Sequence, residues 1–170
     1  MKKVYATLAA MVAIAAMVVV TGLAVPESHV ATSRAVYNRT PDEVWALISD
    51  LATAPEWRRG VDDMERVAGR GEVWREKGRF GEVTYEVERV PGSRRMVMRI
   101  VDHGAFGGSW TYHVDEHPAG ATLTITETGE IHNPVFRAIA RYILGYHGTM
   151  DEYLRSLGER FGQAVEPVHP

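Results

Sequence analysis

Residues 40–45 read Thr-Pro-Asp-Glu-Val-Trp, the most informative stretch of the sequence for the fold. Thr at the cap position, Pro at the first helical position and Glu three residues after the cap form a capping box, which is typical of a helix start. Val44, Leu47, Ile48 and Leu51 follow at helical spacing. The pattern predicts a short amphipathic helix.

The segments on either side of this helix have the pattern of strands. Residues 29–38 contain neither Gly nor Pro and predict a first strand. After Ala54-Pro55-Glu56-Trp57, which indicates a second short helical turn, apolar and polar residues alternate in several runs between residues 83 and 126. Turn signals such as Pro91-Gly92-Ser93 separate the runs. Residues 62–80 are less regular, and we expect two more strands there. Short sequential strands joined by tight turns indicate an antiparallel meander.

A long helix is predicted from Asn133-Pro134 onward, with Asn as the cap and Pro at the first position. Spacings of three and four place one set of residues on a single helix face: Phe136, Ala140, Ile143, His147, Met150, Leu154, Leu157 and Phe161. Gly145 and Gly148 each cost about 1 kcal/mol relative to Ala within a helix. They indicate a bend, a close approach of the sheet or a ligand, or a poorly optimised segment.

The N-terminal segment is apolar. Residues 4–25 carry no charge and follow Lys2 and Lys3. At about 1.5 Å per residue a helix of this length reaches roughly 33 Å, enough to cross a bilayer core. One interpretation is a single-pass anchor in a bacterial inner membrane, with the domain on the exported face. The other is a signal peptide cut near Gly22-Leu23-Ala24, which leaves a periplasmic or secreted protein. The expected division is 1–25 for this segment, 26–163 for the domain and 164–170 for a flexible tail.

Composition excludes several classes of function. The chain has 170 residues, no Cys and a formal net charge of −3. The absence of Cys excludes disulfide scaffolds, Cys-based zinc sites, thiol catalysis, iron–sulfur clusters and a lipid-modified N-terminal Cys. The negative charge gives no sign of a nucleic-acid-binding surface. The seven His have no metal-ligand spacing, so we expect neither a metal nor a cofactor.

Three motifs carry a resemblance to a known superfamily. Thr40-Pro41-Asp42-Glu43-Val44-Trp45, Ser49-Asp50 and Pro55-Glu56-Trp57 resemble landmarks of the SRPBCC or START-like group, in particular its polyketide cyclase/dehydrase-like members. The resemblance covers about residues 29–162. It implies an α+β helix-grip fold: a curved antiparallel sheet of about six to seven strands wrapped around a long C-terminal helix, with two short helices after the first strand. The N-terminal transmembrane or signal helix would precede this domain. Such folds hold an apolar cavity between sheet and helix, but their activities differ widely.

The candidate ligand-binding residues are those expected to face this cavity. They are Tyr85, Met96, Met98, Trp110, Tyr112, Glu127, Ile143, His147 and Met150. Flexible Met and amphipathic aromatic side chains suit an adaptable apolar pocket, although a filled core uses the same residues. Glu127 has the inward parity of Leu123 and Ile125, so it is the natural partner for His147. Alternatively, Glu127 lies at the wet end of its strand and His147 binds the backbone.

Three functions remain open at this stage. The first is a non-catalytic binder or carrier of an apolar small molecule, such as a lipid, a quinone or a polyketide-like compound, held near a membrane by residues 4–25. The second is a cyclase, aromatase or hydrolase that uses Glu127 and His147 as acid and base. The third is a structural or interaction module with a filled core.

Overall fold

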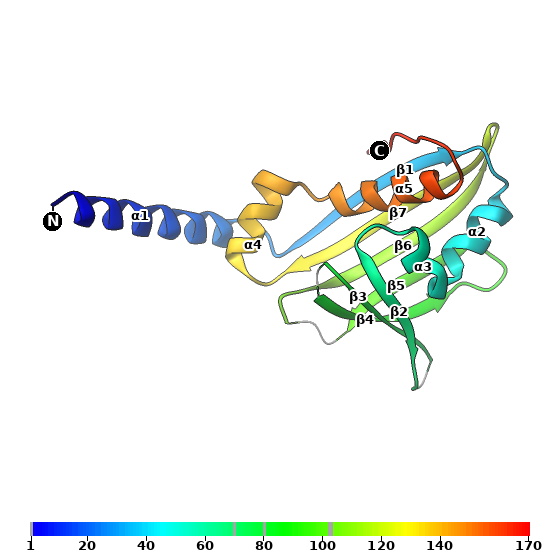
Figure 1. Cartoon of the computed structure of the whole chain (residues 1–170), viewed down its shortest axis with the longest axis horizontal. Coiled ribbons are helices and arrows are strands. Elements are labelled where there is room, and N and C mark those ends of the chain that lie inside the picture. The colour runs from blue at the N-terminus through cyan, green and yellow to red at the C-terminus, as the bar shows by residue number, and fades with distance from the viewer. Residues whose placement is uncertain (1, 70, 80, 102–103) are drawn as a thin grey trace.

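The computed structural model describes residues 2–69, 71–79, 81–101 and 104–170 (Figure 1). The helical segments are α1 (Lys2–Ala24), α2 (Pro41–Ser49), η1 (Leu51–Thr53), α3 (Ala54–Trp57), α4 (Pro134–Ile139), η2 (Ala140–Leu144) and α5 (Gly148–Arg160). The strands are β1 (Ser28–Tyr37), β2 (Val61–Val67), β3 (Glu72–Gly78), β4 (Gly81–Arg89), β5 (Arg95–Val101), β6 (Phe106–His117) and β7 (Gly120–Ile131).

All seven strands form one antiparallel sheet in the order β1-β7-β6-β5-β4-β3-β2. Strands β2 to β7 follow one another as a meander, and β1 pairs with β7 over its whole length, from Ser28 opposite Glu130 to Tyr37 opposite Ala121. The predicted α+β helix-grip architecture is confirmed, and the irregular stretch 62–80 supplies strands β2 and β3.

The core lies between one face of the sheet, called the inner face below, and helices α2, α3 and α5. Successive strand residues point to opposite faces, so every second residue enters the core. The predicted capping box holds α2 in place: Glu43 N–H donates to Thr40 Oγ1 at 3.3 Å, and Thr40 N–H donates to Glu43 Oε2 at 2.7 Å. Val44 and Ile48 of α2 are fully buried.

The prediction of one continuous C-terminal helix is wrong, because the helix is broken between residues 144 and 148. η2 is a π-helical turn in which Gly145 N–H donates to Ala140 O at 2.8 Å. Gly145 then takes φ 73° and ψ 170°, a conformation that favours glycine and redirects the chain. Helix α5 starts at Gly148 and packs on the sheet beside β1, whereas α4 lies at the base of α1 (Figure 1).

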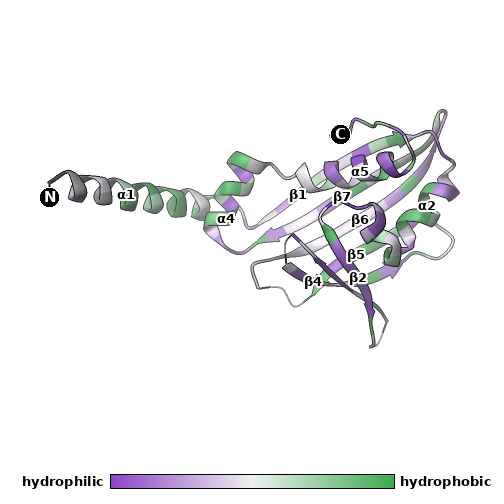
Figure 2. Ribbon diagram, viewed as in Figure 1, coloured by the Kyte–Doolittle hydropathy of each residue, from purple (hydrophilic) through white to green (hydrophobic). Residues whose placement is uncertain are grey.

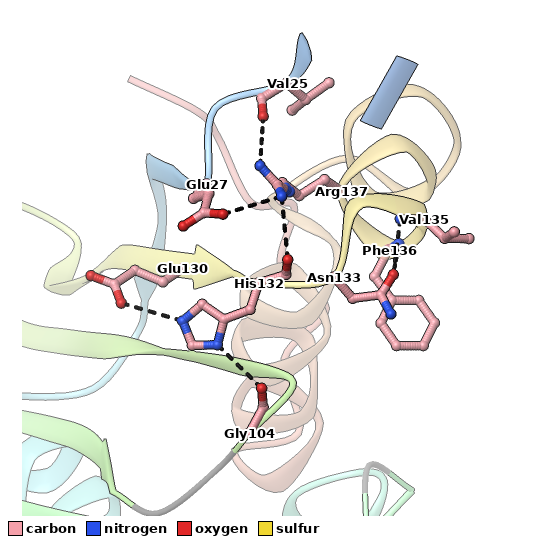
Figure 3. A network of polar contacts seen from close by, with 9 residues as sticks. All are labelled: Val25, Glu27, Gly104, Glu130, His132, Asn133, Val135, Phe136 and Arg137. Carbon is pink, nitrogen blue, oxygen red and sulfur yellow. Dashed lines mark hydrogen bonds and ion pairs between the residues drawn. The ribbon is translucent and has the colours of Figure 1, made fainter. Parts of the chain in front are cut away.

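Arg137 joins α4 to the start of the domain (Figure 3). Its side chain is buried and donates to Val25 O at 3.1 Å and to His132 O at 3.2 Å, and it forms an ion pair with Glu27 at 3.1 Å. Nearby, Gly22 of α1 lies so close to Pro134 that a Cβ would overlap the Pro134 carbonyl. These contacts fix α1 and α4 to each other.

The C-terminal tail, expected to be a flexible segment over 164–170, lies against β1. Arg34 and Val168 exchange two backbone hydrogen bonds of 2.9 Å. Val165 is buried in the core, and His169 lies 3.1 Å from the Asp151 carboxylate. The tail therefore covers part of the edge that β1 would otherwise expose.

α1 projects from the domain along the long axis of the molecule, and its residues are largely hydrophobic (Figure 2). Large side chains such as Met17 and Val20 are exposed on it. Within the part of the chain that the structure describes, no helix combines the length and the apolar character needed to cross a membrane. The transmembrane helix predicted for residues 4–25 is therefore not confirmed.

Candidate functional site on the inner face of the sheet

Glu127 is an acidic side chain on the otherwise apolar inner face of β7. Its Oε2 accepts a hydrogen bond from Trp110 Nε1 at 2.9 Å, because Trp110 lies directly opposite Glu127 in the β6–β7 register. Its Oε1 lies 3.1 Å from His29 Nε2 on β1. The side chains of His29 and Glu127 are only 9% and 19% exposed. His29, Trp110 and Glu127 are called the Glu127 cluster below.

The Glu127 cluster leaves capacity for a ligand. A carboxylate has about four acceptor positions, and the two protein contacts occupy one on each oxygen. A hydroxyl or amide group on a ligand can therefore donate to Glu127 without displacing either partner. A carboxylate beside an imidazole is also an arrangement that can take up or release a proton during a reaction.

A second polar group lies further along the inner face. Arg58, which follows α3, pairs with Glu76 of β3 at 2.7 Å, and its guanidinium lies 5.2 Å from the centroid of the Tyr153 ring. The two charged side chains are 16% and 9% exposed. Burial alone would lower the pKa of Arg58, but the Glu76 carboxylate and nearby phenols outweigh it and raise the pKa overall.

Three tyrosines surround this ion pair: Tyr85, Tyr112 and Tyr153. Together with Arg58 and Glu76 they are called the Arg58 cluster below. Burial, the largest cause for each, raises the pKa of all three phenols above the ordinary value. The phenols therefore stay neutral at physiological pH. A neutral phenol offers a proton donor inside the domain, in contrast to the fixed positive charge of Arg58.

Aromatic rings connect the two clusters. The centroid of the Tyr153 ring lies 5.4 Å from that of Tyr112, 6.2 Å from that of Trp110 and 5.2 Å from that of Trp57. Rings at these separations make favourable edge and tilted contacts. The inner face thus carries a continuous aromatic surface with an acidic group at one end and a buried ion pair at the other.

The site is nearly filled in this conformation. A recess next to Trp57, Arg58, Tyr112 and Tyr153 has a volume of about 10 Å³. That is room for about one water molecule. The Trp57 Nε1–H is buried there, and no hydrogen-bond acceptor is found for it among the described residues. A larger hollow of about 190 Å³ lies near Val73, Glu86 and Arg99, which are side chains of the outer face. A ligand larger than water must therefore displace part of the protein to enter the recess at Trp57.

The structure distributes the predicted site residues unevenly. Met96, Met98, Tyr112 and Met150 are buried in the core, and Tyr85 and Trp110 pack against it, partly exposed. The expectation that Ile143 faces the sheet is wrong: it is 75% exposed, since η2 turns away before α5 begins. A role in ligand binding stays a prediction for the others.

The expected pairing of Glu127 with His147 does not occur. His147 Nδ1 lies 3.2 Å from Ser33 Oγ, and Ser33 donates to Asp151 Oδ1 at 2.8 Å. The His147 ring also stacks on His169 at 3.9 Å. The break at Gly145 places His147 at the start of α5, where these groups are its neighbours, and His29 takes its expected place beside Glu127.

The residues that sequence reasoning missed are His29, Arg58 and Glu76. His29 shares the inward parity of Ala31 and Ser33 in β1, a signal that could have identified it. Arg58 and Glu76 lie in the irregular region around β2 and β3, which gives no such signal. Among the described residues no group of three or more His, Asp or Glu has a geometry that could hold a metal ion.

The comparisons with known proteins agree with this architecture. Residues 28–162 match the family model described as polyketide cyclase / dehydrase and lipid transport. No curated protein matches the chain.

Among solved structures, the chain is similar to a START superfamily protein from Mycobacterium smegmatis, with TM-score 0.62, 14% identity, and coverage of 79% of this chain and 97% of that one. It is also similar to norcoclaurine synthase from Thalictrum flavum, with TM-score 0.62, 12% identity, and coverage of 84% and 90%. A third similar structure is the Zhui aromatase/cyclase from Streptomyces sp. R1128, with TM-score 0.58, 15% identity, and coverage of 78% and 90%. Identities this low establish the fold alone, whereas the family model spans most of the chain. The chain therefore belongs to the polyketide cyclase / dehydrase and lipid transport family, within the START-like superfamily.

Proposed function

We propose that the domain binds an apolar, ring-containing small molecule on the inner face of the sheet and holds it by a hydrogen bond to Glu127. One observation carries the proposal: a carboxylate that is only 19% exposed lies at the end of an aromatic surface and retains free acceptor positions. A side chain of this kind is costly in a filled apolar core, because an ionised carboxylate loses hydration there. A ligand that donates a hydrogen bond to Glu127 replaces part of this lost hydration.

The family supports the same class of ligand. Its description joins polyketide cyclase, dehydrase and lipid transport, all of which concern largely apolar substrates or cargo. The aromatic rings around Tyr153 supply broad apolar contact, and the Arg58 cluster supplies a cation and neutral phenols for oxygen atoms at the far end. We infer that the ligand is planar in part and bears at least one hydroxyl or similar donor.

Two naphthalene derivatives test the proposal by equilibrium dialysis against the full-length protein. 2-Naphthol carries a hydroxyl, whereas 2-methoxynaphthalene has the same rings and no donor. Glu127→Gln removes the charge and keeps the shape of the side chain. A hydrogen bond to a charged group is worth about 1.5–3 kcal/mol, so the variant should bind 2-naphthol about 10- to 100-fold more weakly.

The matched control is Glu130→Gln, on the same strand but with an exposed side chain. It should leave both affinities unchanged. The proposal fails if the wild-type protein binds neither compound, or if Glu127→Gln weakens both compounds equally.

A catalytic role is the second candidate, and the hydrogen bond between Glu127 and His29 favours it. In this role Glu127 removes a proton next to a ligand carbonyl, the first step of a cyclisation or dehydration. 2-Acetylnaphthalene in D₂O tests it, because exchange of its methyl protons reports such a base. Exchange faster than in buffer, lost in Glu127→Gln and kept in Glu130→Gln, would support an enzyme. Binding without faster exchange would favour a carrier.

We further propose that α1 attaches the domain to a membrane, with the domain on the exported face. Support comes from the uncharged stretch 4–25 and from the exposed large side chains of α1. Protease treatment of intact spheroplasts tests the arrangement. We expect the domain to be digested and to remain membrane-bound without protease; a protected domain, or one released by washing, would contradict it.

A further inference from the structure

The Tyr146 ring lies against His29 of the Glu127 cluster. Its ring stacks on the His29 imidazole, with centroids 3.9 Å apart and planes inclined by 15°. The His29 side chain is only 9% exposed, and Tyr146 is half-buried against the core. An aromatic ring therefore already occupies a stacking face of His29, the imidazole that contacts Glu127.

The segment that carries Tyr146 is flanked by two loosely packed glycines. Tyr146 stands in the break between η2 and α5, after Gly145 with φ 73° and two residues before Gly148. No neighbouring atom lies within 4 Å of the position that a Cβ would take on either glycine, so neither is held by packing at that point. The next residue, His147, is fixed to Ser33 and stacked on His169. Rotation of the Tyr146 side chain, with backbone adjustment at Gly145 and Gly148, can therefore move the ring while α5 stays in place.

The preceding helical turn does not hold the segment on the sheet. Tyr142 and Ile143 of η2 are 66% and 75% exposed, and α4 packs against α1. The recess at the Arg58 cluster is too small for an organic ligand. At the Glu127 cluster the Tyr146 ring lies on His29, so a ligand that stacks on His29 must move this ring. Tyr146 stacks on His29 and directly follows Gly145, so it is the side chain that we expect to move.

We propose that the Tyr146 ring fills part of the ligand site in the free protein. It is displaced when a planar aromatic ligand stacks on His29 and donates a hydrogen bond to Glu127. The inference rests on the proposed function and names its ligand class: a flat ring system with a hydroxyl at its edge. The phenol of Tyr146 is itself a small ligand of that class. Its competition lowers the affinity of the wild-type protein and keeps the empty site covered.

Removal of the ring should therefore improve binding. An aromatic stack of this kind corresponds to about a 2- to 10-fold change in affinity. We expect Tyr146→Ala to bind 2-naphthol that much more tightly than the wild-type protein in equilibrium dialysis of the full-length chain. Tyr146→Phe keeps the stacked ring and should bind as the wild-type protein does.

Tyr142→Ala is the matched control, since it removes the same side chain from an exposed position four residues earlier. It should leave the affinity unchanged. Comparison between variants cancels partitioning of the probe into α1, which all of them share. Binding by the wild-type protein that Tyr146→Ala leaves unchanged or weakens would overturn the inference alone. If neither the wild-type protein nor Tyr146→Ala binds, the proposed function fails as well.

A measurement on the wild-type protein needs no variant to fold. Hydrogen exchange followed by mass spectrometry should show faster exchange of the peptide containing residues 145–148 when 2-naphthol is bound, because Tyr146 has left its stack. The peptide from β7 should exchange more slowly or stay unchanged. Slower exchange at residues 145–148 with bound 2-naphthol would mean that the ligand rests on Tyr146 rather than replacing it, and would overturn the inference.

Discussion

The ion pair between Arg58 and Glu76 predicts a large and non-additive loss of stability. Both side chains are mostly buried, with 16% and 9% exposed. Arg58→Met retains much of the side-chain volume but leaves the Glu76 carboxylate uncompensated next to Tyr85, Tyr112 and Tyr153. Breaking a buried pair in this way costs about 3–5 kcal/mol, most of which is the cost of the remaining charge.

Urea denaturation followed by far-UV circular dichroism measures the effect. The matched control is Arg59→Met, because Arg59 is the neighbouring residue and pairs with Glu159 where the side chains are 59% and 54% exposed. An exposed pair is worth less than about 1 kcal/mol. We therefore expect Arg58→Met to lower the free energy of unfolding several times more than Arg59→Met.

The double variant Arg58→Met/Glu76→Leu separates the charge from the packing. It replaces the pair with apolar side chains, which is often neutral or stabilising in buried positions. We expect it to be more stable than Arg58→Met. The reasoning is refuted if Arg58→Met lowers the free energy of unfolding no more than Arg59→Met does. It is also refuted if the loss in the double variant equals the sum of the losses in Arg58→Met and in Glu76→Leu, each measured alone.

Three further predictions concern pH, the tail and the base of α1. Hydrogen bonds from Arg89 hold the pKa of Glu72 below its usual 4.5, so its contribution to stability is complete above that value and is lost as the pH falls through the lowered pKa. The urea midpoint of Glu72→Gln should thus fall less steeply than that of the wild-type protein from about pH 5 to pH 3; equal slopes would argue against this role. Removal of residues 164–170 takes away the buried side chain of Val165 and the two backbone hydrogen bonds between Arg34 and Val168, which should cost about 3 kcal/mol in urea denaturation, whereas removal of Pro170 alone should cost nothing measurable. Gly22→Val forces α1 away from Pro134; hydrogen exchange of α4 should rise while the urea midpoint of the sheet stays the same, and unchanged exchange would contradict the contact.

The parts of the fold that could be predicted are those set by neighbours in the sequence. The capping box at Thr40 and Glu43 needs three consecutive peptide units and forms as expected. Alternation in β4 to β7 fixes which side chains face the core, so the inward direction of Tyr112 and Glu127 followed from parity alone.

The parts that could not be predicted depend on distant segments. Helical spacing continues through Gly145, and only its cost relative to Ala hinted at a break. Helix α4, just before the break, contacts α1, which is distant in the sequence. Glu127 pairs with His29 because β1 aligns with β7 in one particular register, 98 residues apart along the chain. Parity identified His29 as inward, but no local signal gives that register.

The pairing of β1 with β7 also sets an order of events during synthesis. β1 ends at Tyr37, and its partner begins at Gly120. At about 5–20 residues per second the ribosome needs roughly 4–17 s to make the intervening chain. Such distant contacts close late and slow folding. Until then Ala31, Ala35 and Tyr37 have no partner strand, so the nascent chain exposes these side chains of its future core to chaperones.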